Sequence, residues 1–379
     1  MKIVFASDSF KGSLSSPETA ELLGRAAREV FGKVETESVL CADGGEGTAD
    51  AVTNALGGER VPVTVRGPLG GKVAAFYGRL PGGRAIVESA AASGLTLVPE
   101  EKRDVLRASS FGTGELIAAA ISGGAKSLAV GIGGTAMNDG GTGCLRALGA
   151  RFYDENGAEL EGRGEDLEKI RRADFSELEK RMRGVEITVM CDVLNPLCGE
   201  KGATRTFARQ KGASDEDIER LEKGMENWRE ALKKSFSKDP NDIPGAGAAG
   251  GLGAALSLVL GGKMRSGIDA VLDLVAFDEK LEGADLVVTG EGKLDSQSEM
   301  GKAAAGVARR AKDKGVPTVA LCGSVSGGGF SFTRLGISSL MTTVNAPMSL
   351  DAAMKNAREL YYDAAVRMFA FIKLGREMR

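Results

Sequence analysis

The sequence predicts a protein of the α/β class with two domains, on three observations. The chain has 379 residues, which is enough for two domains that each bury a substantial core. Short apolar runs typical of strands alternate with helical patterns over most of its length. Apolar residues make up 42% and charged residues 27% of the chain, which is the composition of an ordinary globular protein.

The chain opens with a strand, a loop and a helix. The strand is expected at residues 2–6. Ser15 or Ser16 is the expected N-cap of the helix, and Glu18 completes a capping box. Apolar residues then recur at helical spacing, so one face of the helix is expected to be buried. A second strand is expected at 34–42.

The middle of the chain begins with three short strands separated by Gly and Pro turns. They are expected to form an antiparallel set at 61–65, 73–78 and 84–88. Helices and strands alternate again from residue 109. The segment 214–236 predicts a long amphipathic helix. The apolar residues expected on its buried face are Ile218, Leu221, Met225, Trp228 and Leu232.

Three more strands close the chain, in the segments ADLVVTGEG, VPTVALCGS and ISSLMTTV. Together with the first two strands they make five, the number in a flavodoxin-like doubly wound parallel sheet. We therefore expect a discontinuous flavodoxin-like domain at residues 1–60 and 285–379. A second α/β domain, at 61–284, is expected to be inserted into it.

Charge and cysteine content restrict the expected partners and location. The formal net charge is −3 and no long basic run occurs, so neither nucleic acid nor an anionic membrane is an expected partner. No apolar segment is long enough to span a bilayer. The five cysteines form no CxxC pair, which is typical of reduced thiols in a cytoplasmic protein.

Histidine is absent, which excludes a histidine general base, a Ser–His triad and a zinc site built from histidines. Any catalysis must therefore depend on carboxylates, lysine, arginine, hydroxyls, backbone amides and a bound ion. Glycine numbers 54, about double its usual share of roughly 7%. Such a chain lets the backbone approach small, polar, anionic ligands closely.

Five loops that follow expected strands carry acidic residues, often flanked by glycines. Each loop alone is a weak signal, because a tight turn also explains it. At the carboxyl ends of parallel strands, however, such residues face the ligand crevice. The candidate site residues in these loops are Asp8, Ser9, Lys11 and Ser13; Asp43 and Gly44; Gly133, Gly134, Thr135, Asn138 and Asp139; Asp192, Asn195 and Lys201; and Gly290, Glu291, Asp295 and Ser296.

The loop GIGGTA at 131–136 leaves three interpretations open. It matches the Gly-x-Gly-x-x-Ala dinucleotide pattern, and Asp154 follows about 20 residues later. It could also be a phosphate or nucleotide loop of another kind, or a packing turn. No Walker A sequence occurs in the chain.

The chemistry that suits these loops together is metal-assisted phosphoryl transfer. Carboxylates would hold Mg²⁺, while lysine and backbone amides would spread positive charge around the phosphates. One carboxylate would orient or deprotonate the attacking hydroxyl.

The ordered motifs resemble the type I glycerate kinase family almost from end to end. They are DSFKGSLS, ADGGEGT, GPLG, ESAAASGL, SSFGTGELI, GIGGTAMNDGGTG, CDVLNPLCGEKGA, PGAGAAGGLG, SGID, ADLVVTGEGKLDSQS and GVA. The resemblance implies a flavodoxin-like domain with a second α/β domain, use of ATP with Mg²⁺, and 2-phosphoglycerate as product. Ser7 replaces a usual proline, and GKAAAGVA lacks another. These departures concern loop rigidity rather than reactive groups.

We therefore expect an ATP-dependent glycerate 2-kinase that acts on D-glycerate in a cleft between the two domains. Asp192 is expected to orient or deprotonate the glycerate hydroxyl, and Lys11 to face a carboxylate or phosphate. Asp8 is a further catalytic candidate. The metal candidates are Asp43, Glu291 and Asp295. The alternatives are a nicotinamide-dependent oxidoreductase of a small hydroxy acid, suggested by GIGGTA with Asp154, and a non-catalytic nucleotide-binding regulator.

Overall fold

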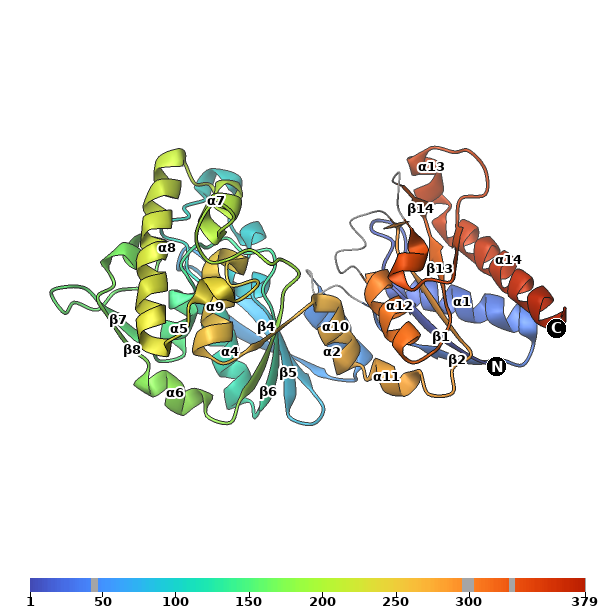
Figure 1. Cartoon of the computed structure of the whole chain (residues 1–379), viewed down its shortest axis with the longest axis horizontal. Helices are drawn as coiled ribbons and strands as arrows, with labels where there is room; N and C mark the ends of the chain where they lie inside the picture. The colour runs from blue at the N-terminus through green and yellow to red at the C-terminus, as the bar shows by residue number, and fades with distance from the viewer. Residues whose placement is uncertain (42–46, 295–302, 327–330, 379) are drawn as a thin grey trace. The chain divides into compact units, whose positions relative to one another are not determined.

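The computed structural model of the chain is shown in Figure 1. The residues that it describes are 1–41, 47–294, 303–326 and 331–378. Within these ranges, no helix is both long enough and apolar enough to cross a membrane.

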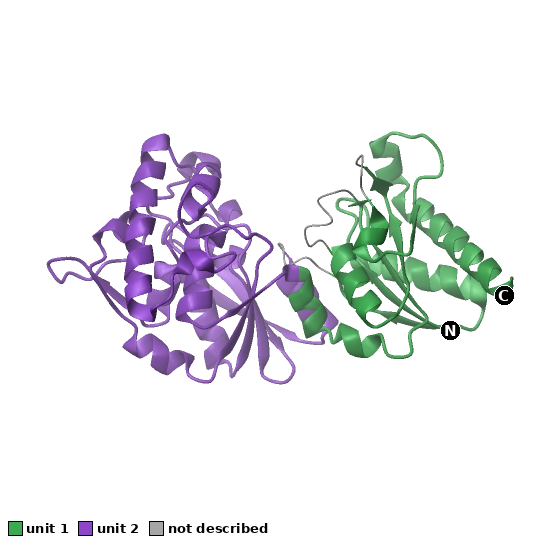
Figure 2. Cartoon of the chain, in the orientation of Figure 1, with its two compact units in different colours: residues 1–43, 268–379 green, residues 44–267 purple. Residues whose placement is uncertain are grey.

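The chain forms two compact units, which we call unit 1 and unit 2 (Figure 2). Unit 1 comprises residues 1–43 and 268–379, and unit 2 comprises 44–267. The boundaries expected from the sequence, near 60 and 285, lie later in the chain. The earlier first boundary has a physical reason, because the helix α2 begins at Thr48 and joins the sheet of unit 2. The Ala49 amide donates a hydrogen bond of 2.6 Å to Glu88 there.

Unit 1 is built on a parallel sheet of five strands in the order β15-β13-β11-β1-β2. These are the five strands expected from the sequence. The three inner strands β1, β11 and β13 carry short apolar runs, such as LVV in β11, that suit strands buried on both faces. The bounds are β1 Lys2–Ser7, β2 Glu35–Ser38, β11 Leu286–Gly290, β13 Thr318–Cys322 and β15 Ser339–Thr342.

Helices cover both faces of this sheet. Phe5 and Leu321 belong to the core cluster under α1 and α14. Ala320 and Cys322 point to the opposite face and pack against α12. The helices of unit 1 are α10 Gly267–Leu274, which begins at its boundary, α1 Ser16–Phe31, α11 Phe277–Lys280, α12 Ala303–Asp313, α13 Leu350–Lys355 and α14 Ala357–Glu377. Two short strands, β12 Lys293–Leu294 and β14 Ser324–Val325, pair beside the sheet.

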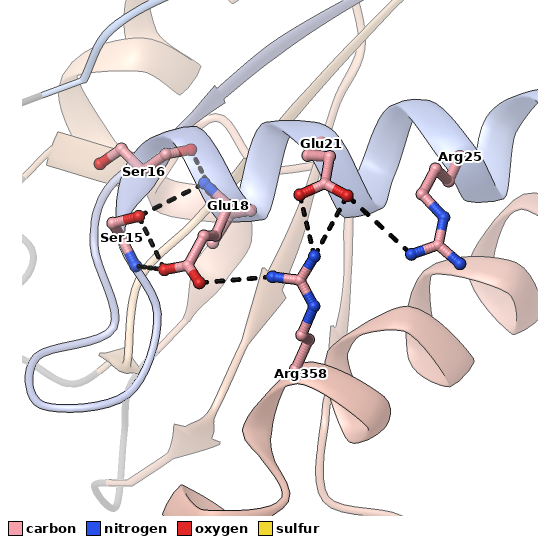
Figure 3. A network of polar contacts seen from close by, with 7 residues as sticks. Ser15, Ser16, Glu18, Glu21, Arg25 and Arg358 are labelled. Atoms are coloured by element: carbon pink, nitrogen blue, oxygen red, sulfur yellow. Dashed lines mark hydrogen bonds and ion pairs between the residues drawn. The ribbon is translucent and has the colours of Figure 1, made fainter.

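The start of α1 follows the expected capping box (Figure 3). Ser15 is the N-cap, and its backbone N–H donates to Glu18 Oε2 over 2.9 Å. The Ser15 backbone and hydroxyl, both bonded to this carboxylate, lower the pKa of Glu18. Arg358 of α14 also bonds Glu18 and donates to Glu21 over 2.9 Å. The two ends of the chain are therefore joined on one side of unit 1.

Unit 2 is built on a mixed sheet of six strands in the order β10-β9-β6-β5-β4-β3. The pairs β3–β4 and β4–β5 are antiparallel, which confirms the expected antiparallel set. The other neighbours are parallel. The bounds are β3 Glu59–Arg66, β4 Lys72–Leu80, β5 Arg84–Glu88, β6 Ser127–Gly131, β9 Glu186–Met190 and β10 Lys263–Arg265. A separate two-stranded antiparallel sheet pairs β7 Arg151–Tyr153 with β8 Arg172–Asp174.

The longest helix of unit 2 is α8, Asp215–Phe236, as the amphipathic pattern predicted. All five apolar residues expected on its inner face are buried. Trp228 is among them, and its indole N–H donates to the Gly140 carbonyl over 3.0 Å. The other helices are α2 Thr48–Ala55, α3 Ala90–Ser93, α4 Phe111–Ser122, α5 Thr142–Ala147, α6 Ser176–Met182, α7 Ala203–Phe207 and α9 Leu252–Ala254.

Candidate functional site

The loops after four parallel strands of unit 1 meet at a crevice of about 700 Å³, which we call the unit 1 crevice. Its lining includes Asp8 after β1, Glu291 after β11, Ser324 after β13 and Thr343 after β15. Parallel strands bring their carboxyl ends to one edge of a sheet, and ligands bind outside that edge where the strand order reverses. Here the order reverses between β1 and β11.

The loop after β1 places Lys11 at the tip of a tight turn. Phe10 and Leu14 exchange backbone hydrogen bonds of 2.8 and 3.1 Å, which closes the turn. Gly12 has φ +79°, a conformation that glycine adopts without strain. The Phe10 ring packs edge-on against Tyr361, with 5.2 Å between centroids. The turn is thus fixed to the core, and Lys11 lines the crevice.

The loop after β11 contributes one buried acid and one exposed cation. Glu291 is 8% exposed, whereas Lys293 is exposed, and both line the crevice. Gly290 lies deeper and has no space for a side chain, because a Cβ there would be 1.9 Å from the Leu321 carbonyl oxygen. Burial, together with the nearby charge of Glu291, raises the pKa of the Cys322 thiol to about 12. That thiol is therefore a packing group rather than a nucleophile.

One wall of the crevice is apolar, and the sequence analysis did not identify it. It is formed around α13 by Met348, Leu350, Ala353 and Met354. Leu350 is 73% exposed, which is unusual for a large apolar side chain at a helix start. The helical spacing of Leu350, Ala353 and Met354, in a segment where the sequence predicted no buried face, was the signal from which this apolar surface could have been found.

Five of the predicted site residues are brought together in the unit 1 crevice. They are Asp8, Ser9, Lys11, Ser13 and Glu291. Four other candidates, Asp43, Gly44, Asp295 and Ser296, lie outside the described residues. Among the residues that the structure does describe, no three acids or cysteines are grouped as metal ligands.

In unit 2, Asp139 lies at the centre of the loop that joins β6 to α5. It is fully buried, and its Oδ2 accepts hydrogen bonds from the Ser110 amide at 2.6 Å and the Ser110 hydroxyl at 2.7 Å. Its Oδ1 accepts from the Gly141 amide at 3.0 Å. Burial raises the pKa of Asp139, and these bonds oppose that rise. Oδ2 therefore holds the loop against the start of α4, and Oδ1 holds the turn of the loop itself. With both oxygens engaged in this way, Asp139 is placed to act by positioning the loop.

Two neighbours of Asp139 extend this buried polar network. Asn138 donates from Nδ2 to the Thr204 hydroxyl over 3.0 Å, and its buried Oδ1 has no hydrogen-bond partner in the part of the chain that the structure describes. Lys211 is buried and donates to the Met137 carbonyl over 2.7 Å. Burial lowers the pKa of Lys211 to about 8, against the attraction of Asp139. A buried lysine was not expected from the sequence.

The glycines of the same loop are the part that remains accessible. Gly133 and Gly134 are exposed, while Thr135 is buried. A Cβ on Gly133 would meet no atom within 4 Å. The Gly134 carbonyl accepts from the Leu95 amide at 2.8 Å, which fixes the turn. The two glycines can therefore offer backbone to a ligand from a fixed position.

The loop after β9 carries the three remaining candidates. Asp192 is exposed, and its Oδ1 accepts from the Gly267 amide, the first residue of α10, over 2.9 Å. Asn195 donates from Nδ2 to the Lys201 carbonyl over 2.8 Å and so holds its own loop together. The Lys201 side chain is exposed. Asn195 and Lys201 belong to unit 2, whereas the residues that line the unit 1 crevice belong to unit 1.

The dinucleotide interpretation of GIGGTA fails at Asp154. In the dinucleotide pattern, the acid about 20 residues after the glycine loop ends a neighbouring strand of the same sheet and hydrogen-bonds a ribose. Asp154 lies instead beyond β7, whose only strand partner among the described residues is β8, outside the six-stranded sheet. Its Oδ1 accepts from the Asn156 and Ala158 amides at 2.9 and 2.8 Å, which makes it a turn residue.

Together, the two units define an α/β protein with acids, hydroxyls and lysines gathered at the carboxyl edge of a parallel sheet. A family model described as the glycerate kinase family matches residues 3–373. The chain is 43% identical to a glycerate kinase of Bacillus cereus, over 100% of this chain and 99% of that protein. It is also 43% identical to a glycerate 2-kinase of Escherichia coli, over 99% of each. The chain belongs to the glycerate kinase family.

A solved structure agrees with this assignment. The crystal structure described as a putative glycerate kinase 2 from Salmonella typhimurium matches with a TM-score of 0.89 and 41% identity. The match covers 100% of this chain and 99% of that chain. The expected family resemblance is thereby confirmed over the whole chain.

Proposed function

We propose that this protein transfers the γ-phosphoryl group of ATP to the C2 hydroxyl of D-glycerate and releases 2-phosphoglycerate. The observation that carries the proposal is the unit 1 crevice, where Asp8, Lys11, Glu291 and Lys293 lie at one edge of the sheet of a glycerate kinase family member. Acids and lysines at one edge suit a reaction whose main demand is the control of phosphate charge.

We assign unit 1 to the flavodoxin-like doubly wound class. In chain order its strands run 2-1-3-4-5 across the sheet, which is the order of that class. Helices on both faces support the same assignment. In that class, ligands bind where the strand order reverses, and the unit 1 crevice lies at this point of the sheet.

We further assign the nucleotide to the unit 1 crevice. A volume of about 700 Å³ is much more than three-carbon glycerate needs, and it lies within the range of sites for larger ligands. The apolar wall around Met348 and Met354 can take a purine ring, while Lys11 and Lys293 can take phosphates. A pocket that is apolar on one side and charged on the other suits a nucleotide better than a small acid.

The same crevice fits Mg²⁺ bound with ATP. Mg²⁺ is usually held by one or two carboxylates together with substrate phosphates. Asp8 and Glu291 supply two carboxylates in the described part of the crevice. When bound, the ion would neutralise charge on the phosphates. Asp43 and Asp295 stay predictions as further ligands.

Asp192 remains our candidate for the group that orients or deprotonates the glycerate hydroxyl. It is exposed, and it is held in place by the Gly267 amide. Asn195 would support the shape of the same loop, and Lys201 would offer a cation to the glycerate carboxylate. Gly133 and Gly134 would offer backbone amides to an anion.

A single assay separates this function from the nicotinamide-dependent alternative. The protein is incubated with D-glycerate and either Mg·ATP or NAD⁺, and release of ADP or formation of reduced nicotinamide is measured. We expect ADP release that requires glycerate, and no reduction of NAD⁺. ADP release without dependence on glycerate would contradict the proposed substrate.

The place of the nucleotide is tested by Lys11→Gln. Loss of a cation that bonds a phosphate should raise KM for ATP about tenfold or more, with little change in KM for glycerate. Lys33→Gln removes the same charge from an exposed position of unit 1 and serves as the control. A raised KM for glycerate alone would assign the crevice to glycerate instead.

A further inference from the structure

Unit 2 contains a second pocket, of about 630 Å³, that is lined mainly by cations. It lies where β3 ends, beside the start of α4, and shares no residue with the unit 1 crevice. We call it the arginine pocket. Its cations are Arg66, Lys102, Arg107, Arg146 and Arg163. Its acids are Asp104 and Glu161.

Both acids of the arginine pocket are already engaged. The Glu161 carboxylate pairs with Arg163. Asp104 Oδ1 accepts a hydrogen bond from the backbone amide of Arg107 over 3.1 Å, so it serves a turn of the main chain. The Arg146 guanidinium donates to the Glu161 carbonyl over 2.7 Å. Arg146 also pairs with Glu159 over 3.2 Å, outside the pocket lining. Within the lining itself, five cations face two acids.

Two of these cations are available to a ligand. Neither the Lys102 ammonium nor the Arg107 guanidinium makes an ion pair or hydrogen bond with any described part of the chain. Both side chains are exposed. Arg66 is held over the Phe111 ring at 4.1 Å, and its only ion pair among the described residues, with Glu115, is long at 3.7 Å.

The walls of the pocket are fixed by backbone hydrogen bonds. The Gly67 amide donates to the Gly71 carbonyl over 2.5 Å, which closes the GPLG turn. The Ser109 amide donates to the Pro68 carbonyl over 2.9 Å, and its hydroxyl donates to the Gly162 carbonyl over 3.1 Å. A pocket whose backbone is fixed before a ligand arrives loses less entropy on binding.

We propose that the arginine pocket binds a small phosphorylated anion, at a site separate from phosphoryl transfer. Guanidinium groups match the geometry of phosphate oxygens and can bond two of them at once. The pocket has the size of a small-molecule site. Its apolar lining is limited to Pro68, Leu69 and Phe111, which favours a compact anion over a ligand with a large ring system.

The test uses inorganic pyrophosphate as the probe and isothermal titration calorimetry at low ionic strength. The variant Lys102→Gln/Arg107→Gln removes the two available cations. The control Arg183→Gln/Lys234→Gln removes the same charge from exposed positions of unit 2. Lys11→Gln separates this pocket from the unit 1 crevice.

We expect the arginine pocket of the wild type, the control and Lys11→Gln to bind pyrophosphate with the same Kd, and any binding at the unit 1 crevice to be weakened in Lys11→Gln alone. The pocket variant should bind about tenfold more weakly or worse, because charge-assisted hydrogen bonds are lost. It should keep the wild-type melting temperature and the wild-type KM for ATP and glycerate. Equal binding by the pocket and control variants would overturn the proposal. A raised KM for either substrate would also overturn it, because the pocket would then belong to the site of phosphoryl transfer.

Discussion

Replacement of Asp139 by asparagine tests whether this carboxylate holds the glycine-rich loop of unit 2. Asp139 uses both of its oxygens, with Ser110 at one and the Gly141 amide at the other, and it is fully buried. An asparagine amide has one oxygen. If that oxygen faces Ser110, the amide NH₂ faces the Gly141 N–H, and two donors are left without acceptors.

The magnitude follows from those two donors. Each buried donor without a partner costs about 1–3 kcal/mol, so we expect Asp139→Asn to lower the free energy of unfolding by about 2–6 kcal/mol. For a unit of more than 200 residues, this corresponds to a fall in Tm of roughly 4–24 °C. The substitution removes little volume, so loss of packing does not contribute.

The chain provides its own probe and its own control for this experiment. Trp228 is its single tryptophan and bonds the Gly140 carbonyl next to Asp139, so tryptophan fluorescence reports the unfolding of this region. Asp154→Asn is the matched control, because both amides bonded by Asp154 share Oδ1, which an asparagine retains. We expect the control to change stability by less than about 1 kcal/mol. Equal melting of the two variants would refute the assigned role of Asp139.

Three further substitutions test other parts of the molecule. Burial lowers the pKa of Lys211 to about 8, so between about pH 8 and 10.5 the lysine is protonated in the unfolded chain but not in the folded one. Over this range, the free energy of unfolding of the wild type relative to Lys211→Met should therefore rise by about 1.4 kcal/mol per pH unit. Urea-unfolding free energies of the two proteins that run parallel with pH would contradict this. Gly141→Ala should lower the free energy of unfolding by about 2–4 kcal/mol in thermal melts, because φ is +75° and the new Cβ would lie 2.4 Å from the Cβ of Ala255. The control Gly157→Ala has the same kind of backbone angle, φ +78°, but no atom near the new Cβ, so it should cost about 1 kcal/mol. Asp192→Asn should reduce kcat roughly 10²–10⁴-fold with a normal melt, and an unchanged kcat would show that Asp192 is not the general base.

The site residues that the sequence predicted in unit 1 were those next to strands. Asp8 and Glu291 could be predicted because each follows a short apolar run, and parallel strands bring such positions to one edge. Ser324 and Thr343 follow β13 and β15 in the same way, so they too could have been predicted at this edge. The helical spacing of the apolar residues around Met354 was a local signal for the wall, but its place at the crevice depends on how α13 packs, which the local sequence does not show.

The role of Asp139 could not be predicted from local sequence. The motif GIGGTAMND is typical of a ligand loop, and the acid within it was expected to face a ligand. Its main partner is Ser110, 29 residues earlier in the chain, and this contact exists only once α4 packs beside the loop. The burial of Lys211 could not be predicted either, because a lysine that follows Arg209 and Gln210 is expected at the surface.

Phosphorus NMR of the reaction mixture tests the central proposal most directly. The protein is incubated with D-glycerate, Mg²⁺ and ATP, and the ³¹P spectrum is recorded without proton decoupling as ATP is consumed. We predict signals of ADP and a phosphomonoester doublet, because the phosphorus of 2-phosphoglycerate couples to the single proton on C2. A triplet would show phosphorylation of the C3 hydroxyl, and loss of ATP to inorganic phosphate alone would contradict glycerate phosphorylation altogether.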